Sequence, residues 1–257
     1  MIISHKNNTY KERWERLGID RYNGAYYYSR EIVKNIIPNV KTKRSWMTVN
    51  VPGRGEDGMI VFVHNNLHPE NYEWLSKYKD IVLVCGVPET VDKVKRYGHA
   101  IYLPLSIDVE YVKQFALPKS MKAGAAFAGR RSKRNMPGVK LPDNIKMLEG
   151  YSRKELLKTM AQFEEIYGVG RTALEAVCLG CKVKAYDPRY PDPDVWKVID
   201  NKEAAKLLQK ALDDIDGIKR ENPKPKKKTA PKKTTTKRTT AKKNITNKAK
   251  AKKETKA

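Results

Sequence analysis

The chain has few cysteines and no long apolar run. Its three cysteines are Cys85, Cys178 and Cys181, which do not amount to a disulfide framework and fit a reducing cytoplasm. No run of eighteen apolar residues occurs, so we expect no membrane span. The first residues become charged after position 3 and lack a secretory apolar core. The expected location is therefore cytoplasmic.

Cys178 and Cys181 form a C-x-x-C pair, but the sequence offers no second C-x-x-C or His pair that would complete a zinc site. We interpret them as two small buried residues at a helix end and the following turn. Asp192-Pro193-Asp194 resembles an acidic metal clamp, yet it lies among prolines and tyrosines and is interpreted as a polar loop. No metal and no cofactor are expected.

The positive charge is concentrated at the C-terminus. Residues 218–257 hold 17 Lys or Arg against two acids, whereas residues 1–217 hold 36 basic and 27 acidic side chains. The 218–257 segment has no aromatic residue, no Leu and no Val. Such a segment buries too little apolar surface to offset its ordering entropy, so we expect a disordered basic tail.

The rest of the chain alternates short apolar runs with helical patterns, which predicts an α/β fold with parallel strands buried on both faces. The expected strands are 45–51, 59–63, 81–85, 100–105, 123–128, 145–148, 163–167 and 181–186. The expected helices are 26–37, 69–79, 88–97, 152–160, 171–179 and 202–215. Ser152 and Glu155 have the spacing of a capping box.

These strands and helices fall into two groups along the chain, and the boundary between the groups lies near residues 108–122. We predict an N-terminal α/β domain over 1–108, a second α/β domain over 109–217 and the tail over 218–257. Two Rossmann-like halves would face each other across a cleft at the carboxyl ends of their strands, where such sheets bind ligands.

The most informative stretch is 166–187, IYGVGRTALEAVCLGCKVKAYD. A Gly-x-Gly turn that opens a helix presents backbone N–H groups and a positive dipole end, which suit a phosphate. Arg171 and Glu175 lie four residues apart and share a helix face. Amides and a cation for phosphates, with a carboxylate for sugar hydroxyls, are what a nucleotide-sugar site requires.

The order of motifs resembles the nucleotide-binding domain of GT-B glycosyltransferases, particularly retaining enzymes of the family 4 type. Residues 103–108 (LPLSID) look like the family's interdomain P-x-G-I-D linker, and 126–130 (AFAGR) like the strand and Gly-Arg that open the second domain. Residues 148–157 resemble its "flG…eel" stretch, and 167–183 its "fG…lEAmAcGcPV" signature.

The resemblance implies that the α/β domain over 109–217 binds the nucleotide sugar and that the α/β domain over 1–108 is the acceptor side. It also implies a set of donor-binding residues. Arg130 matches the diphosphate-binding arginine, and the family's lysine falls within 131–134, for which Lys133 and Arg134 are candidates. Phosphate-binding amides map to Gly168, Val169 and Gly170, followed by Arg171, and Glu175 matches the ribose-binding glutamate. The family's first acid, near the donor sugar, would fall at Tyr167, which is a departure from the pattern. The basic run 130–134 also fits a surface patch for nucleic acid.

The first half offers weaker candidates. Gly24, before a helical run, matches a glycine loop that approaches the donor from the N-terminal domain, although glycine before a helix is common. His64 follows a predicted strand, where a cleft residue can bind hydroxyls or act as a catalytic base; a loop histidine without a role fits equally well.

The Lys/Ala/Pro/Thr tail is similar in composition to linker-histone tails, and its charge predicts salt-dependent binding of nucleic acid, DNA above all.

Together, the resemblance, the glycine turn and the tail favour a glycosyltransferase that moves a sugar from a nucleoside diphosphate sugar, a UDP-sugar for example, to an acceptor. Some bacteriophages glycosylate hydroxymethylated DNA bases with GT-B enzymes, so the acceptor could be such a base in a phage-infected cell. The alternatives are a non-catalytic GT-B-like nucleic-acid-binding protein and a transferase acting on glycans.

Overall fold

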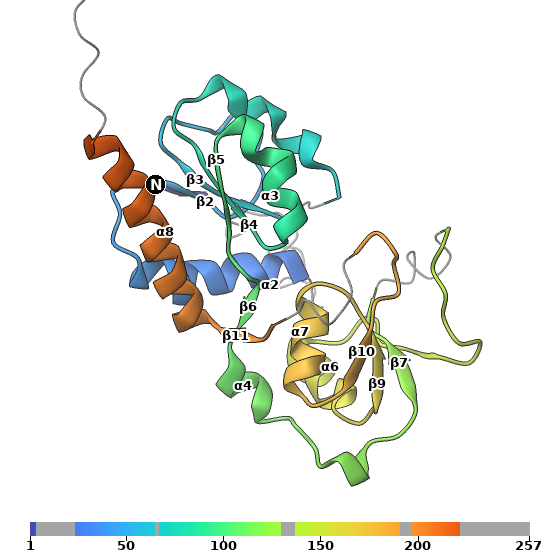
Figure 1. Cartoon of the computed structure of the whole chain (residues 1–257). Coiled ribbons are helices and arrows are strands. Elements are labelled where there is room, and N and C mark those ends of the chain that lie inside the picture. Colours follow the sequence, from blue (N-terminus) through green and yellow to red (C-terminus); the bar gives the residue numbers. More distant parts are fainter. Residues whose placement is uncertain (4–23, 65–66, 130–136, 191–196, 222–257) are drawn as a thin grey trace, which may run out of the picture. The chain divides into compact units, whose positions relative to one another are not determined.

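A computed structural model describes the backbone of residues 1–3, 24–64, 67–129, 137–190 and 197–221. Residues 1–221 form one compact unit, and residues 222–257 form a second unit that lies outside the described residues. Strands and helices alternate along the first unit and every strand pair is parallel, so the predicted α/β class is confirmed (Figure 1).

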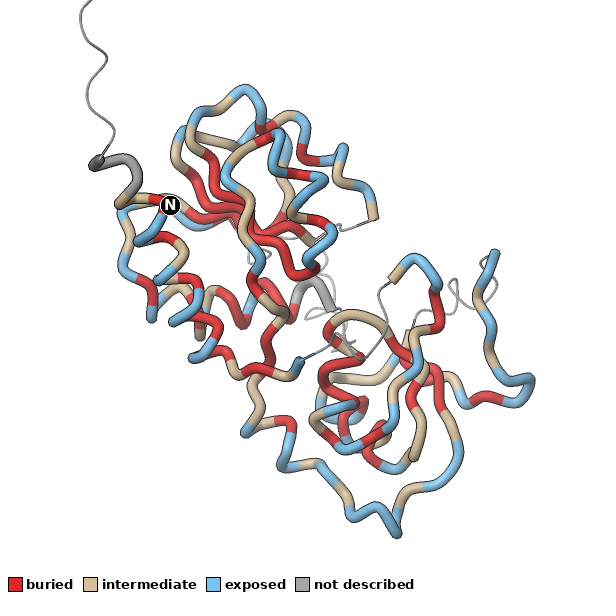
Figure 2. The backbone as a smooth tube through the Cα atoms, in the orientation of Figure 1, coloured by how far each residue is buried: buried red, intermediate tan, exposed pale blue. Residues whose placement is uncertain are grey.

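The first sheet has five strands in sequence order: β1 (Ile2–Ile3), β2 (Trp46–Met47), β3 (Ile60–Val63), β4 (Val82–Cys85) and β5 (His99–Tyr102). Every residue of β3 and β4 is buried, as Figure 2 shows in red. Their side chains alternate between two apolar clusters: Phe62 and Val84 lie in one and Val61 and Leu83 in the other. This period of two explains the continuous Val/Ile runs, because both faces of the sheet are covered.

One face of this sheet is covered by α2 (Gly24–Glu31), the π-helix Ile32–Ile36 and α8 (Asn201–Glu221), and the other by α3 (Pro88–Val94) and the 3-10 helix Pro69–Lys77. Short 3-10 turns also occur at Ile37–Asn39, Lys95–Tyr97 and Lys119–Met121. The helix predicted over 26–37 is thus α-helical only as far as Glu31.

The second sheet has four strands in the order β10 (Lys182–Lys184), β9 (Glu165–Tyr167), β7 (Ala125–Phe127) and β8 (Lys146–Met147). Helices α6 (Arg153–Met160) and α7 (Arg171–Cys178) contribute to its main core. The capping box that opens α6 is confirmed, since Ser152 N donates to Glu155 Oε2 (3.0 Å) and Glu155 N donates to Ser152 Oγ (3.3 Å).

The two sheets differ in topology. Strand order in the first sheet follows the sequence without reversal, so the expected Rossmann-like order is wrong for its described strands. In the second sheet, β8 lies on one side of β7 and β9 on the other, so the winding reverses between β7 and β9. The second sheet therefore has a switch point, which is where ligands bind in open α/β sheets.

The chain returns from the second sheet to the first. Strand β6 (Ser106–Ile107) pairs with β11 (Ile199–Asp200), and α4 (Val109–Lys113) follows β6. Helix α8 begins directly after β11 (Figure 1). Its apolar side chains belong to the same core cluster as Phe62 of β3 and Val84 of β4. The division at residues 108 and 217 remains a prediction. Helix α8 runs to Glu221, four residues into the predicted tail.

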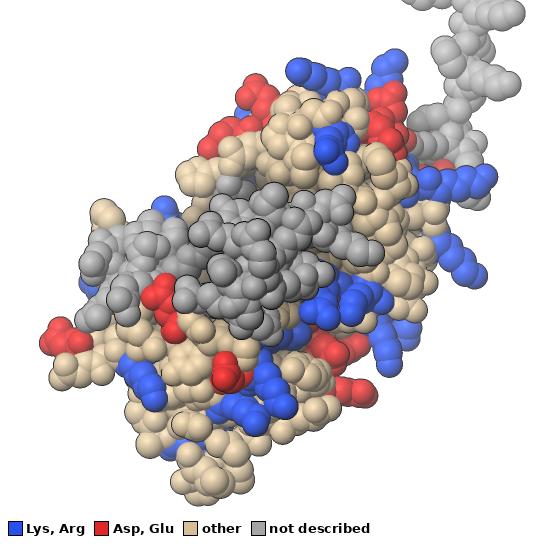
Figure 3. Space-filling model, turned by 180° about the vertical axis from the view of Figure 1, so that it is seen from behind, with Lys and Arg blue, Asp and Glu red and all other residues tan. Residues whose placement is uncertain are grey.

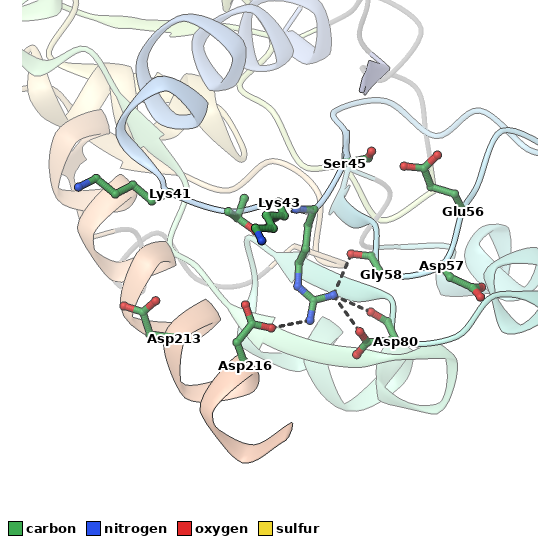
Figure 4. Close-up of a pocket in the computed structure, with 11 residues that line it drawn as sticks. Lys41, Lys43, Ser45, Glu56, Asp57, Gly58, Asp80, Asp213 and Asp216 are labelled. Atoms are coloured by element: carbon green, nitrogen blue, oxygen red, sulfur yellow. Dashed lines mark hydrogen bonds and ion pairs between the residues drawn. The ribbon is translucent and has the colours of Figure 1, made fainter. Parts of the chain in front are cut away.

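Arg44 connects the amino ends of three strands to α8 (Figure 4). Its Nη1 donates to Gly58 O (2.8 Å) and Asp80 O (3.0 Å), and its Nη2 pairs with Asp216 Oδ1 (2.8 Å). Its Nη1 also lies 3.2 Å from Asp80 Oδ2. The Arg44 side chain is 9% exposed, whereas those of Asp80 and Asp216 are 30% and 37% exposed, so water partly screens the two ion pairs. They fix the strand starts and the end of α8 relative to one another.

Arg44→Met should lower the free energy of unfolding by about 1–2 kcal/mol, because two carbonyls and the partly exposed carboxylates of Asp80 and Asp216 lose their common donor. Urea unfolding measures this. Arg54→Met, at an exposed position, is the matched control and should shift the free energy by less than about 0.5 kcal/mol. Equal effects of the two variants would contradict a structural role for Arg44.

Candidate functional site

The carboxyl ends of β7 and β9 lie side by side at the switch point. Ala128 N donates to Tyr167 O (2.9 Å), which joins the two strand ends just before Gly129 and Gly168. A Cβ on Gly129 would lie 2.5 Å from the fully buried Phe127 ring, so a side chain is not tolerated there without moving that ring. The chain thus leaves this edge through a glycine on each strand. The Phe127 ring requires glycine at position 129, whereas a Cβ on Gly168 would make only ordinary contacts at 3.6 Å or more.

The turn 168–170 opens α7 as the sequence predicts. Gly170 has φ +58° and ψ −133°, a conformation that is essentially restricted to glycine, and it precedes Arg171, the first residue of α7. Gly168 N donates to Lys184 O (3.0 Å), so that amide belongs to the sheet and not to an anion site in this structure. Val169 and Gly170 are half-buried. The phosphate role of their amides and of the first turn of α7 stays a prediction.

Arg171 and Glu175 share a face of α7, which confirms the spacing argument. Arg171 Nε donates to Glu175 Oε1 (3.2 Å). Arg171 is 7% exposed and Glu175 is completely buried. In this conformation the Glu175 carboxylate is enclosed by protein, so ribose binding by Glu175 requires the structure to open around it. The ribose role stays a prediction.

Three residues that sequence reasoning missed complete a buried ion cluster around this pair. Arg171 Nη2 also donates to Glu31 Oε1, on α2. Arg153, on α6, donates from Nη1 to Glu31 Oε1 (2.6 Å) and from Nη2 to Glu175 Oε1 (3.2 Å). Asn201 Nδ2 donates to Glu31 Oε2 (3.2 Å). Helices α2, α6, α7 and α8 are thereby bound together by two guanidinium groups, two carboxylates and the Asn201 amide.

His64 lies at the carboxyl end of the first sheet, directly after β3. Its Nε2 is 2.5 Å from Thr48 O, and because a carbonyl only accepts, Nε2 carries the hydrogen and Nδ1 is the basic nitrogen of the neutral ring. Its backbone N donates to Tyr72 Oη (2.9 Å). Packing and hydrogen bonds thus hold the ring in one orientation. The catalytic role of His64 remains a prediction.

Tyr28 connects His64 with the ion cluster. Its ring lies edge-on to the His64 ring at 5.2 Å between centroids. Burial raises the pKa of Tyr28 far above its usual range, Arg171 acts in the opposite direction and Glu31 raises it further. Tyr28 therefore lies within electrostatic reach of Arg171 and Glu31. Because Tyr28 also contacts His64, the structure brings the His64 and Arg171 regions together around α2, which begins at Gly24.

Tyr167 replaces the acid that the resembled family has near the donor sugar. It is half-buried, with Lys184 Nζ 5.6 Å from its ring centroid, while Lys184 Nζ pairs with Glu165 Oε1 (2.7 Å). Burial, followed by the hydrogen bond and charge of Glu165, raises the pKa of Tyr167, so it stays neutral at physiological pH. Tyr167 does not supply the negative charge of the missing acid.

The C-x-x-C pair lies at the C-terminal end of α7 and in the following turn, as interpreted from the sequence, but only Cys181 is buried and Cys178 is half-buried. Cys178 Sγ is 3.9 Å from Val109 O and Cys181 Sγ is 3.5 Å from Met160 O. Burial raises the pKa of both thiols. The carbonyl end of a helix also disfavours a thiolate, in contrast to the helix N-terminus where reactive cysteines are activated.

Cys178 and Cys181 should therefore react slowly with iodoacetamide at pH 7.5. We expect native protein to be alkylated at least about tenfold more slowly than urea-unfolded protein, because the thiolate fraction is suppressed and access is restricted. Mass spectrometry of quenched time points measures the rates. Rapid alkylation of either residue in the native protein would contradict the inert-thiol interpretation.

A cavity of about 540 Å³ surrounds Arg44 at the amino ends of β2, β3 and β4. Its lining residues are Lys41, Thr42, Lys43, Arg44, Ser45, Glu56, Asp57, Gly58, Asp80, Asp213 and Asp216. Five carboxylates against three cations make it unsuitable for a diphosphate, and its edge of the sheet is opposite to the one where α/β folds bind ligands.

Several predicted residues lie outside the described part of the chain. They are Arg130, Lys133, Arg134, Asp192-Pro193-Asp194 and the tail beyond Glu221. On the face of the molecule in Figure 3, Lys and Arg side chains are interspersed with Asp and Glu. The described surface on this face therefore does not resemble a single basic patch.

Within residues 1–3, 24–64, 67–129, 137–190 and 197–221, no group of three or more His, Cys, Asp or Glu side chains is placed to hold a metal ion. Over the same residues, none of the helices combines the length and the apolar character that crossing a membrane requires.

No family model, curated protein or solved structure matched the chain.

Proposed function

We propose that this protein is a glycosyltransferase that moves a hexosyl group from a nucleoside diphosphate sugar to an acceptor. The observation that carries the proposal is the switch point between β7 and β9, where one strand leads into Gly129 and the other into the glycine turn that opens α7. Ligands of open α/β sheets bind at such a point, and helix N-termini favour phosphates.

Each candidate residue has a role in this chemistry. The Val169 and Gly170 amides, with Arg130, would stabilise charge on the leaving diphosphate, and Lys133 or Arg134 would add a second cation. Glu175 would bind the ribose after the ion cluster opens. His64 Nδ1 would take the proton of the acceptor hydroxyl.

The acceptor that we favour is a hydroxymethylated base in DNA. The 17 basic residues of segment 218–257 would hold the catalytic unit near a polyanion and raise its local concentration there. This acceptor suits a protein acting in a phage-infected cytoplasm. A glycan acceptor remains the alternative within the same reaction class.

A second function, that of a non-catalytic nucleic-acid-binding protein, is favoured by a different observation. Glu175 is completely enclosed and Tyr167 stays neutral where the resembled family has an acid. A protein with Glu175 enclosed and no acid at position 167 would bind nucleic acid without catalysing transfer from a sugar donor.

Incubation with radiolabelled UDP-glucose and hydroxymethylated duplex DNA tests the proposal. We expect label on the duplex, lost on deletion of residues 222–257 at physiological salt. Label on glycan acceptors that survives this deletion would favour the glycan alternative. No transfer to any acceptor, with no thermal stabilisation by any nucleotide, would favour the binding protein.

A further inference from the structure

The carboxylate of Glu31 pairs with the side chain of the first residue of α7. The first turn of α7 contains no acid, and Gly170 provides no side-chain cap. The first helical residue is instead a cation, Arg171, which is unfavourable beside the positive end of a helix unless a negative group is close. Glu31, 140 residues away in sequence, supplies that group through Oε1.

Two guanidinium groups converge on the same oxygen. Arg153 Nη1 and Arg171 Nη2 both donate to Glu31 Oε1, and Asn201 Nδ2 donates to Oε2. A pair of arginines on one oxygen is an arrangement that also binds phosphate. The Arg153 guanidinium lies 5.7 Å from the Tyr27 ring centroid and 5.1 Å from that of Tyr111, so aromatic rings hold it independently of Glu31.

The charges of this cluster balance. Arg153 and Arg171 offset Glu31 and Glu175, and the four side chains are no more than 12% exposed. A diphosphate added to the intact cluster would introduce excess negative charge in a poorly solvated space, where like charges repel strongly. Arg171 becomes available to a diphosphate only when Glu31 withdraws.

We propose that Glu31 is an internal competitor for the nucleoside diphosphate: its carboxylate occupies Arg153 and Arg171 in the empty protein and is displaced by the diphosphate of the donor. This inference rests on the proposed function. Glu31 acts through the two arginines, so it is a positioning residue that controls donor access. Its release would also loosen the enclosure of Glu175, which shares both arginines with it.

Glu31→Gln removes the competing charge and keeps the shape of the side chain. Isothermal titration with UDP and with inorganic pyrophosphate should show binding about tenfold tighter or more than in the unchanged protein, since the ligand no longer displaces a carboxylate. Glu203→Gln, exposed at the start of α8, is the matched control for net charge and should change neither affinity by more than about twofold.

A second measurement uses the unchanged chain and does not depend on a variant that folds. Saturation with UDP should increase hydrogen exchange at the α2 amides around Glu31, because that helix loses its anchor to α6 and α7. Unchanged or increased protection of α2 would overturn the proposal.

The outcomes separate this proposal from the function on which it rests. UDP binding that is no tighter in Glu31→Gln overturns the competitor role and leaves the transferase standing. Tighter pyrophosphate binding in Glu31→Gln without sugar transfer by either protein supports the competitor and counts against the transferase. Absence of binding of both ligands to both proteins overturns both proposals.

Discussion

Arg171→Met should lower the free energy of unfolding by about 3–5 kcal/mol, because it leaves two buried carboxylates with one guanidinium group. Glu175 is fully buried and Glu31 is 6% exposed, so water does not compensate for the lost partner. Removing one member of a buried ion cluster costs more than the cluster contributes as a whole. Urea unfolding followed by tryptophan fluorescence measures the change.

Two controls make the Arg171 result specific. Arg30→Met removes an exposed cation from α2 and should change stability by less than about 0.5 kcal/mol. The double variant Arg171→Met/Glu31→Gln restores one carboxylate to one guanidinium and should recover part of the loss. An Arg171→Met protein as stable as the unchanged chain would mean that the cluster is not formed in solution.

Gly170→Ala should reduce UDP affinity by about tenfold or more and lower stability by about 1–3 kcal/mol. A Cβ on Gly170 meets no atom within 4 Å, so the cost arises from its φ of +58° and ψ of −133°. Relief of this strain would rotate the amides that open α7 away from a phosphate.

Gly53→Ala is the matched control for this prediction. Gly53 has φ +82°, and a Cβ added there would also meet no atom within 4 Å, but it lies in the loop between β2 and β3. It should lose stability while retaining UDP affinity. Equal losses of affinity in both variants would indicate a general effect of destabilisation, and unchanged affinity in Gly170→Ala would exclude the turn as a phosphate site.

Local patterns in the sequence predicted much of this structure. The glycine turn, the Arg171–Glu175 pair and the Ser152–Glu155 capping box depend on residues within a few positions of each other, so spacing alone indicates them. The buried strands β3 and β4 were also visible as apolar runs. Such features follow from backbone geometry and periodicity.

Long-range partners were not predictable in the same way. Nothing near Glu31 in sequence indicates that its carboxylate binds Arg153 and Arg171, which lie 122 and 140 residues away. The packing of α8 against the first sheet and the order of the strands likewise depend on how distant elements pair. The sequence predicts that the Gly168 amide binds phosphate, because spacing alone does not reveal the hydrogen bond from Gly168 N to Lys184 O.

The most direct test of the proposed phosphate site at the start of α7 is a titration of isotope-labelled protein with UDP, followed through backbone amide NMR signals. The account predicts the largest shifts at Gly129, Val169, Gly170 and Arg171, around the carboxyl ends of β7 and β9. Binding that leaves these amides unchanged and shifts those around Arg44, or no shift at saturating UDP, would contradict it.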